Sequence, residues 1–514
     1  MEKRNNAKAQ HLVIVLLILL SIVTFYYLYL HLVSQIHYIK AIHQIQDKQY
    51  NAAADELKKS IRHEPNNPLP WKNLGQAHHE LAVLKPIKEA FDTSKKARDY
   101  YLTAEKLNPL DAETAYYLAM EEVRLEKLSD YLAYLTNKKQ DHSYQALPYF
   151  EKAIRLSPNA VGYHYDMAIY LYSQGRKDEL LTTIKTLVRI YPPIYYSLKK
   201  EPLWSSSAKE VCKEGLTKAI KEDISAGDAH EAMSNLLSEE KEWPGAISHY
   251  KQALQYKSRD TGSSGLMHLG ELYVKNRQFE EAKDVFFTSL DLSHTREEDL
   301  KRIYYTYKRE GCLEQLSQLY QEAKNQFTFS ITIDLLMAQT FIELNQYDEA
   351  QRILQAINQK KPDAEAYYWL ARIAEIEKNW DKMELAIQKA TVLEPSNSQY
   401  HFIFSQVLRR LNKLARAEKE AGLAIKHRTT PSAWLFDHRA WIRWDKQDYP
   451  GALMDWESAI TLKPGRASFY AHAAEASIQI GNWPLAMDYY QQAITLEPEN
   501  EDYQKRYHEI KAQS

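Results

Sequence analysis

The histidines of this chain are the residues that first suggest a metal site. There are eighteen histidines, and His78 and His79 form the only adjacent pair. Adjacent residues on a helix point about 100° apart, so this pair needs a third group to hold an ion. No H-E-x-x-H or C-x-x-C pattern accompanies it. We therefore expect structural surface histidines here and no metal site.

The other patterns that carry chemistry are missing or isolated. The sequence contains no G-x-S-x-G, Walker loop or G-x-G-x-x-G motif, and only 14 of its 514 residues are glycine. The two cysteines, Cys212 and Cys312, lie a hundred residues apart. We expect both to fill small core positions without a disulfide. The sequence predicts no catalytic residue and no cofactor, and we expect a protein that is not an enzyme.

The charge balance excludes one further class of function. Lys and Arg total 66 against 68 Asp and Glu, which gives a net charge of −2. Proteins that bind nucleic acid through their phosphates usually show a basic excess or a basic stripe. We expect no nucleic-acid partner.

The strongest pattern in the chain is a repeat with a period of about 34 residues. A small residue is followed four places later by a bulky apolar one, and three places later by another small one. Ala452, Trp456 and Ala459 form one copy, with Pro464 five places further on. A second small residue lies twelve places before most copies, within an apolar helical pattern, as at Ala440. Each repeat is therefore predicted to contain two packed helices.

This pattern resembles the tetratricopeptide repeat, whose first helix carries W-x-x-L-G and whose second carries A-x-x-x-F-x-x-A before a proline. The small residues let the two helices approach closely, and proline ends the second helix because it lacks a donor. The resemblance implies an all-α, right-handed superhelical solenoid of about thirteen units over residues 34–498, followed by a capping helix at 499–514. The match is close at Trp71, Leu74, Gly75, Ala97, Tyr101, Ala104 and Pro109.

Three stretches depart from the regular spacing. The steps from Ala53 to Ala97 and from Ala97 to Ala146 are longer than one period, which places inserts near residues 85–96 and 128–143, between the two helices of their units. Each insert is either a pair of lengthened helices with a longer turn or a loop that docks a partner. Prolines and serines interrupt the unit near residues 192–223, where we expect a bend between two sub-arrays.

An apolar segment precedes the repeats. Residues 12–33 contain no acidic residue, lysine or arginine, and as a helix they would span about 33 Å, enough to cross a bilayer. A cleaved signal peptide is the alternative. No small-x-small cleavage pair follows the leucine-rich part, and Tyr26, Tyr27 and Tyr29 suit a membrane interface. We favour an uncleaved single-pass transmembrane helix.

The charges flanking this segment predict its orientation. Lys3, Arg4 and Lys8 precede it, whereas only Lys40 and Lys48 follow closely. The positive-inside rule then places residues 1–11 in the cytoplasm as an amino-terminal tail. The expected location is the inner (plasma) membrane, with the repeats outside it, in the periplasm of a Gram-negative cell.

The resemblance also implies where a partner would bind. In tetratricopeptide arrays the first helix of each unit lines the concave face, with side chains one and four places after its small residue and three and six before it. An extended peptide fits such a face, and a polysaccharide chain is the alternative ligand. A shift of one residue would instead turn the tryptophans into the core. Around Ala371, Ser405 and Ala440 the expected partner-binding residues are Trp434, Asp437, Trp441, Trp444, Phe402, Arg409, the adjacent Arg410, Tyr368 and Arg372.

These features favour a membrane-anchored scaffold that binds protein partners in a cell-envelope assembly, with polysaccharide synthesis or export as the preferred pathway. The alternative is a cytoplasm-facing adaptor for a protease, chaperone or import substrate. Family members that capture chaperone tails use a lysine and asparagine clamp, but Lys72 and Asn73 are adjacent here and cannot form it. A transferase with an accessory array is a third possibility, and the repeats leave no room for its catalytic domain.

Overall fold

The structure is a computed structural model that describes residues 2–137, 144–257, 262–327, 329 and 331–513, with side chains from residue 14 to 512. Within these residues it contains 27 α-helices, one short 3-10 helix and no strand. The chain divides into two compact units, unit 1 at Met1–Asp260 and unit 2 at Thr261–Ser514. The expected all-α fold is therefore confirmed.

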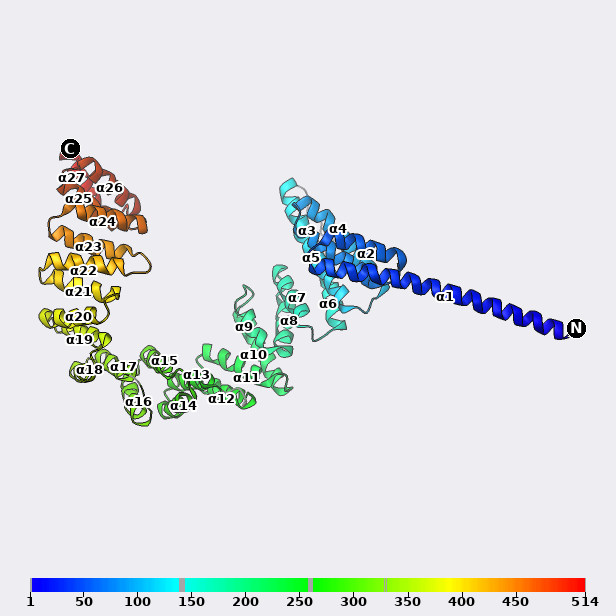
Figure 1. The fold of residues 1–514 in the computed structure, drawn as a ribbon, viewed down its shortest axis with the longest axis horizontal. Helices are drawn as coiled ribbons and strands as arrows, with labels where there is room; N and C mark the ends of the chain where they lie inside the picture. The colour runs from blue at the N-terminus through cyan, green and yellow to red at the C-terminus, as the bar shows by residue number, and fades with distance from the viewer. Residues whose placement is uncertain (1, 138–143, 258–261, 328, 330, 514) are drawn as a thin grey trace. The chain divides into compact units, whose positions relative to one another are not determined.

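Unit 1 is a series of antiparallel helical hairpins that begins with one very long helix (Figure 1). Its helices are α1 (Glu2–Gln46), α2 (Tyr50–His63), α3 (Pro68–Val83), α4 (Ile87–Leu107), α5 (Ala112–Thr136), α6 (Leu147–Leu156), α7 (Val161–Ser173), α8 (Lys177–Ile190), η1 (Pro192–Ile194), α9 (Tyr195–Leu198), α10 (Ser206–Lys221), α11 (Ala226–Glu239) and α12 (Trp243–Tyr256).

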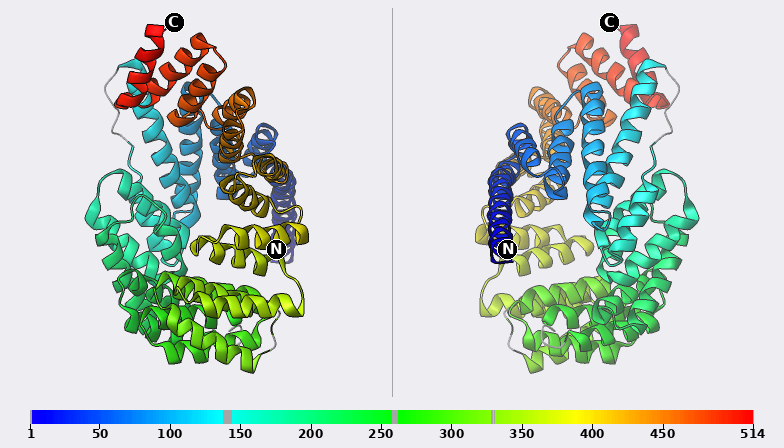
Figure 2. Two further views of the ribbon diagram at one scale, coloured as in Figure 1. Left: turned by 90° about the vertical axis from the view of Figure 1, so that its left-hand side faces the viewer. Right: turned by 90° about the vertical axis from the view of Figure 1, so that its right-hand side faces the viewer.

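Unit 2 continues the same hairpin architecture, and its helices lie in stacked antiparallel pairs in the views of Figures 1 and 2. Its helices are α13 (Ser263–Lys275), α14 (Phe279–Leu292), α15 (Arg296–Arg309), α16 (Leu313–Gln326), α17 (Thr332–Glu343), α18 (Tyr347–Lys360), α19 (Ala364–Ile376), α20 (Trp380–Leu393), α21 (Ser398–Arg410), α22 (Leu414–Lys426), α23 (Ala433–Asp445), α24 (Tyr449–Leu462), α25 (Ala467–Gln479), α26 (Trp483–Leu496) and α27 (Glu501–Gln513).

The small residues of the repeat lie where the helices of a hairpin meet. We call the first helix of each hairpin helix A and the second helix B. Ala440 of α23 and Ala452 of α24 are fully buried, and the indole of Trp456 fills the space beside them. The two helices approach very closely at Gly270 of α13, where an added Cβ would lie 2.3 Å from the Phe286 ring. The period in the sequence therefore corresponds to a repeated helix–helix contact.

Most turns from helix A to helix B have the same backbone conformation, with one left-handed residue and a hydrogen bond that reaches back five residues. After α19, Lys378 adopts a left-handed conformation with φ of 57°, and the Asn379 N–H donates to the Ala374 carbonyl at 2.8 Å. This bond reaches back five residues and satisfies a carbonyl left free at the helix end. Glycine takes the left-handed position after α7, α15 and α25, at Gly175, Gly311 and Gly481.

Proline shapes many turns from helix B to the next helix A. The residue before proline leaves the helical conformation, as at Glu394 before Pro395 with φ of −127° and ψ of 77°, so helix B ends there. The first turn of the following helix A then sends a side chain back to the proline carbonyl. Trp71 Nε1 donates to the Pro65 carbonyl at 2.9 Å, and an imidazole nitrogen of His401 lies 2.9 Å from that of Pro395. Local chemistry thus fixes both kinds of turn.

Helices occupy most of the stretches that depart from the regular spacing. Residues 87–96 lie in α4, which lengthens helix B of its hairpin, and α5 continues to Thr136. Residues 138–143 of the second predicted insert lie outside the described residues. In the stretch 192–223, the short η1 and α9 stand in place of a regular helix A before α10.

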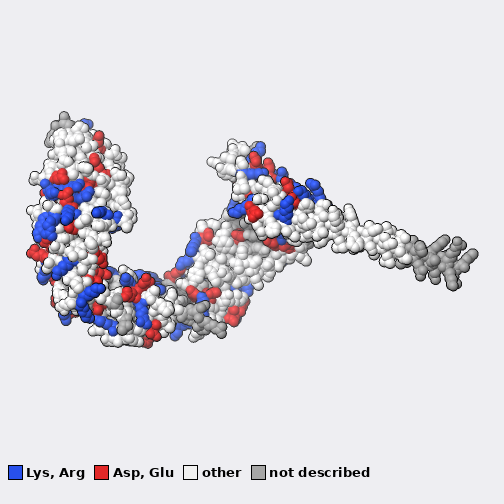
Figure 3. All heavy atoms as spheres, viewed as in Figure 1, with Lys and Arg blue, Asp and Glu red and all other residues white. Residues whose placement is uncertain are grey.

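The apolar segment and the first helix A are one continuous helix, α1. Its side chains from Ile14 to Leu32 are mostly exposed, and burial begins at Ser34, whose hydroxyl lies 2.9 Å from that of Ser60 on α2. In Figure 3 the described side chains in the projecting part of α1 are white, so none of them is a charged lysine, arginine, aspartate or glutamate. Among the described residues, α1 is the one helix long and apolar enough to cross a membrane. It is consistent with a single-pass anchor and equally with a signal sequence.

Candidate functional site

A polar groove of about 410 Å³ lies among four helices of unit 2 and contains two of the predicted partner-binding residues, Arg409 and Arg410. Helices α21 and α23 are helix A of their hairpins, and α19 and the start of α20 complete the walls. We call it the helix-A groove. Its lining residues are Glu375, Trp380, Met383, Gln406, Val407, Arg409, Arg410, His438 and Asp445.

Arg410 is the cation of this groove that is open to a ligand. Its guanidinium carbon lies 4.4 Å from the centre of the Trp380 ring, so the indole face holds the guanidinium plane. No carboxylate within the described part of the chain pairs with it, and Arg410 itself is exposed. A stacked guanidinium keeps its outer N–H donors free, and these match the two oxygens of a carboxylate.

Arg409 is held by the protein itself. Its Nε donates to Asp445 Oδ2 at 2.6 Å, and its guanidinium carbon lies 5.9 Å from the Trp441 ring centre. The pair joins the end of α21 to the end of α23. Arg409 therefore positions α23 and shapes the groove wall, while its charge is already balanced by Asp445.

His438 forms the floor of the groove as a neutral ring. Ser405 Oγ donates to the Phe402 carbonyl at 2.6 Å, so the same hydroxyl accepts from His438 Nε2 at 2.8 Å. Burial, with a smaller contribution from the positive charge of Arg409, lowers the pKa of His438 to about 4. At neutral pH the groove therefore carries the Arg410 charge without a second cation on His438.

The structure keeps two of the predicted tryptophans together and separates the third, because the ring centres of Trp441 and Trp444 lie 6.1 Å apart whereas Trp434 lies elsewhere. Trp441 and Trp444 are half-buried and pack on Trp456, with ring centres 5.4 Å and 5.9 Å from it. Trp434 is 48% exposed at the start of α23, where Arg466 lies 5.1 Å from its ring centre.

The remaining predicted residues are spread over three hairpins. Phe402 packs edge-on against His438, and Asp437 accepts from Trp456 Nε1 at 2.9 Å. Tyr368 stacks on Tyr400 of the next helix A, with ring centres 5.4 Å apart. Arg372 is paired with Glu375 of its own helix. Among the predicted residues, the helix-A groove itself brings together Arg409 and Arg410.

Trp380, His438 and Asp445 line the helix-A groove but were not predicted from the sequence. Trp380 opens a helix B, and a rule that reads helix A positions passes over it. On α23, His438 lies between positions that the rule selects, and Asp445 directly follows the last of them. The sequence does contain a signal for Trp380. It is an aromatic residue at the start of helix B, in the hairpin before the one that carries Arg409 and Arg410.

The adjacent histidines His78 and His79 each form a hydrogen bond with another group of the chain. His79 lies 2.5 Å from Glu121, while His78 is buried with its ring nitrogen 3.0 Å from the Leu74 carbonyl. The expectation of surface histidines is therefore wrong for His78, because the α3–α4 hairpin covers it. Cys212 and Cys312 are buried and free. The described residues contain no group of three or more potential metal ligands.

Comparisons with known proteins identify the repeat. Family models described as tetratricopeptide repeat match residues 313–373 and 439–501. Human protein O-mannosyl-transferase TMTC1 is 27% identical over 205 residues, which are 39% of this chain and 23% of that protein. The DnaJ homolog subfamily C member 7 homolog of Dictyostelium discoideum is 20% identical over 279 residues, 48% of this chain and 51% of that protein. The matches thus span about a quarter and about half of these relatives.

Two solved structures are also similar. Yeast Tom70 is 14% identical, with 93% of this chain and 96% of that chain covered and a TM-score of 0.32. MamA is 17% identical over 34% of this chain and 98% of that chain, with a TM-score of 0.30. The two family-model matches show that residues 313–373 and 439–501 are tetratricopeptide repeats, and other helical hairpins of the chain bury small residues in the same pattern.

Proposed function

We propose that this chain is a membrane-anchored, non-enzymatic scaffold whose helix-A groove binds a carboxylate-bearing segment of a partner protein. The observation that carries the proposal is Arg410, which lies over the Trp380 ring and forms no ion pair with a carboxylate of the described residues. Tetratricopeptide repeats are protein-interaction modules, and a guanidinium with free donors prefers a carboxylate, from an acidic side chain or a chain end.

A peptide fits this part of the array better than a polysaccharide. Sugar rings bind to open aromatic faces, and the tryptophans here are largely engaged. Trp441 and Trp444 pack on Trp456, and the cations of Arg466 and Lys463 lie over Trp434. A role in polysaccharide synthesis or export would then be served through protein partners of the scaffold.

Photocrosslinking from the groove tests the proposal. A photoreactive residue in place of Gln406, which is exposed in the groove, is expected to give a discrete adduct with a partner in native membranes. Arg410→Gln should lower the yield about tenfold, because charge-assisted hydrogen bonds are lost. Arg352→Gln is the control, since Arg352 is exposed and pairs with Glu349 outside the groove. An adduct insensitive to Arg410→Gln would contradict the proposal.

The membrane arrangement is also a proposal. We infer that α1 stays uncleaved in the inner (plasma) membrane with the repeats in the periplasm, supported by its exposed apolar side chains and by the basic residues ahead of it. An alkaline phosphatase fused after Ser514 should be active, because that enzyme needs an oxidising compartment. An inactive fusion would favour the cytoplasm-facing adaptor instead.

A further inference from the structure

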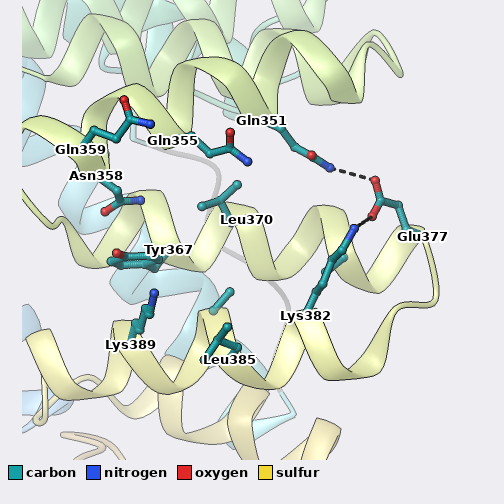
Figure 4. A pocket seen from close by; sticks show the side chains of 12 residues that line it. Gln351, Gln355, Asn358, Gln359, Tyr367, Leu370, Glu377, Lys382, Leu385 and Lys389 are labelled. Atoms are coloured by element: carbon teal, nitrogen blue, oxygen red, sulfur yellow. Dashed lines mark hydrogen bonds and ion pairs between the residues drawn. The ribbon is translucent and has the colours of Figure 1, made fainter.

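A second groove of unit 2, separate from the helix-A groove, is built mainly from helix B residues. It lies over α19, between α18 and α20, and has a volume of about 410 Å³ (Figure 4). We call it the amide groove because four side-chain amides of α18 line one wall. These are Gln351, Gln355, Asn358 and Gln359.

The four amides divide into two that the protein uses and two that it leaves open. Gln351 donates to Glu377 Oε1 at 2.8 Å, and Asn358 accepts from the Asp363 N–H at 2.9 Å. Gln355 and Gln359 are exposed, and their side chains make no hydrogen bond within the described residues. Figure 4 draws both amides beside the groove without a dashed line. Two complete donor–acceptor groups are therefore available to a ligand.

The spacing of the open amides matches an extended peptide. Gln355 and Gln359 are four residues apart on α18, which places them about 6 Å apart along its axis. An extended chain presents main-chain N–H and C=O groups on the same edge every second residue, about 6.6 to 6.8 Å apart. An amide side chain has the donor and acceptor that one peptide group needs.

The floor and the opposite wall add an apolar and a charged contact. Leu370 and Ala374 of α19 form the floor with Ala386 of α20, and Leu385 at the edge is 58% exposed. Lys389 of α20 lies over the Tyr367 ring, 5.1 Å from its centre, and no carboxylate of the described residues pairs with it. The groove therefore has a site for an apolar side chain beside an unbalanced cation.

We infer that the amide groove binds an extended acidic peptide of a protein partner. Gln355 and Gln359 pair with its main chain, an apolar side chain covers Leu370 and Leu385, and a carboxylate meets Lys389. This inference goes beyond the proposed function because it uses a different groove and different residues. It gives the scaffold two docking surfaces within one unit.

Fluorescence anisotropy with defined peptides tests this inference on the full chain in detergent micelles. The probes are fluorescein-labelled, eight-residue alanine peptides that carry one leucine and one glutamate at separations of one to four residues. At least one probe should bind measurably. Gln355→Ala with Gln359→Ala should weaken it tenfold or more, since each lost hydrogen bond is worth about fivefold. Lys389→Met should weaken the glutamate probe about fivefold and leave its glutamine counterpart unchanged.

Three controls make the result decisive. N-methylation of the probe removes main-chain N–H donors. Binding of the methylated probe should therefore no longer be weakened by the Gln355→Ala and Gln359→Ala double change. Gln388→Ala replaces an exposed glutamine of α20 outside the groove lining and should change nothing. Arg410→Gln should also change nothing, so failure here is distinct from failure of the helix-A groove. Absence of binding, binding insensitive to both glutamines, or a self-association lost in the double variant would overturn the inference.

Discussion

Single residues at helix crossings set how closely the hairpins pack. Gly270 of α13 faces Phe286 of α14, whose ring is fully buried. Alanine at position 270 would bring a methyl group to 2.3 Å from that ring, so the ring or a helix must move. The identity of the small residue therefore matters most where the facing side chain is largest.

We expect Gly270→Ala to lower the stability of unit 2 by about 1–3 kcal/mol, the usual cost of overpacking. Gly162→Ala is the matched control, because a Cβ at Gly162 of α7 meets nothing within 4 Å. That change should be neutral or raise the free energy of unfolding by about 0.5 kcal/mol, because alanine lowers the conformational entropy of the unfolded chain. Thermal unfolding followed by circular dichroism measures both, and equal behaviour of the two variants would refute the packing argument.

His438 links the helix-A groove to pH. Burial lowers its pKa to about 4 in the folded chain, below the 6.5 of an unperturbed histidine. Below pH 6.5 the unfolded chain binds a proton that the folded chain refuses, so stability falls with falling pH. Above pH 6.5 both states are neutral and the effect vanishes. Between pH 7 and 5 the local loss is about 2 kcal/mol.

Hydrogen exchange of α21 and α23 should report this loss after correction for intrinsic rates. His438→Gln keeps a donor for Ser405 and removes the titration, so protection of these helices should become nearly independent of pH. Helices far from His438, such as α27, serve as the internal reference. Equal pH dependence in the variant and the parent chain would show that other groups control these helices.

At the scale of elements, the terminal helix α27 covers the last hairpin. Ile510 is buried against the cluster around Tyr490, and Arg506 forms a two-pronged ion pair with Glu475 at 2.7 and 2.8 Å. This pair is partly exposed, so its contribution is about 1 kcal/mol or less. Ile510 is the buried apolar contact of α27 with this cluster, and the rings of Tyr503 and Tyr507 pack beside it.

Arg506→Met should increase amide exchange of α27 by up to about fivefold and leave α19–α21 unchanged, because neighbouring hairpins interact locally. Ile510→Ala should have a larger effect, since a buried side chain is removed. Hydrogen exchange followed by mass spectrometry distinguishes the two. An Arg506→Met effect larger than that of Ile510→Ala would mean that the ion pair dominates the attachment.

For the whole molecule, α1 decides whether the repeats are tethered. No side chain of the described residues covers the apolar part of α1. The same helix continues into the first hairpin, where Ser34 and Ala41 are buried. Deletion of residues 1–30 should move the chain from the membrane fraction to the supernatant, because about 17 or more apolar residues are needed to span a bilayer. The full chain should resist carbonate extraction, and release of the full chain by carbonate would contradict an anchor.

The sequence alone determined the hairpin repeat, since a fixed period of small and bulky residues encodes a contact that each unit makes with its neighbours. It also predicted where many B helices end, because proline after helix B acts through its own backbone. Arg409 was predicted from the groove-facing register that the family resemblance implies for helix A, and Arg410 was named as its neighbour; both line the helix-A groove.

Only the tertiary structure decided which side chains are open to a ligand. Arg410 stacks on Trp380 of the preceding helix B, whereas Arg409 is balanced by Asp445 of the next helix A. Gln355 and Gln359 stay unpaired while Gln351 meets Glu377, although all three share one face of α18. Periodicity fixes the face of a helix on which a residue lies. The partner that each side chain meets depends on the packing of neighbouring hairpins, which period alone does not encode.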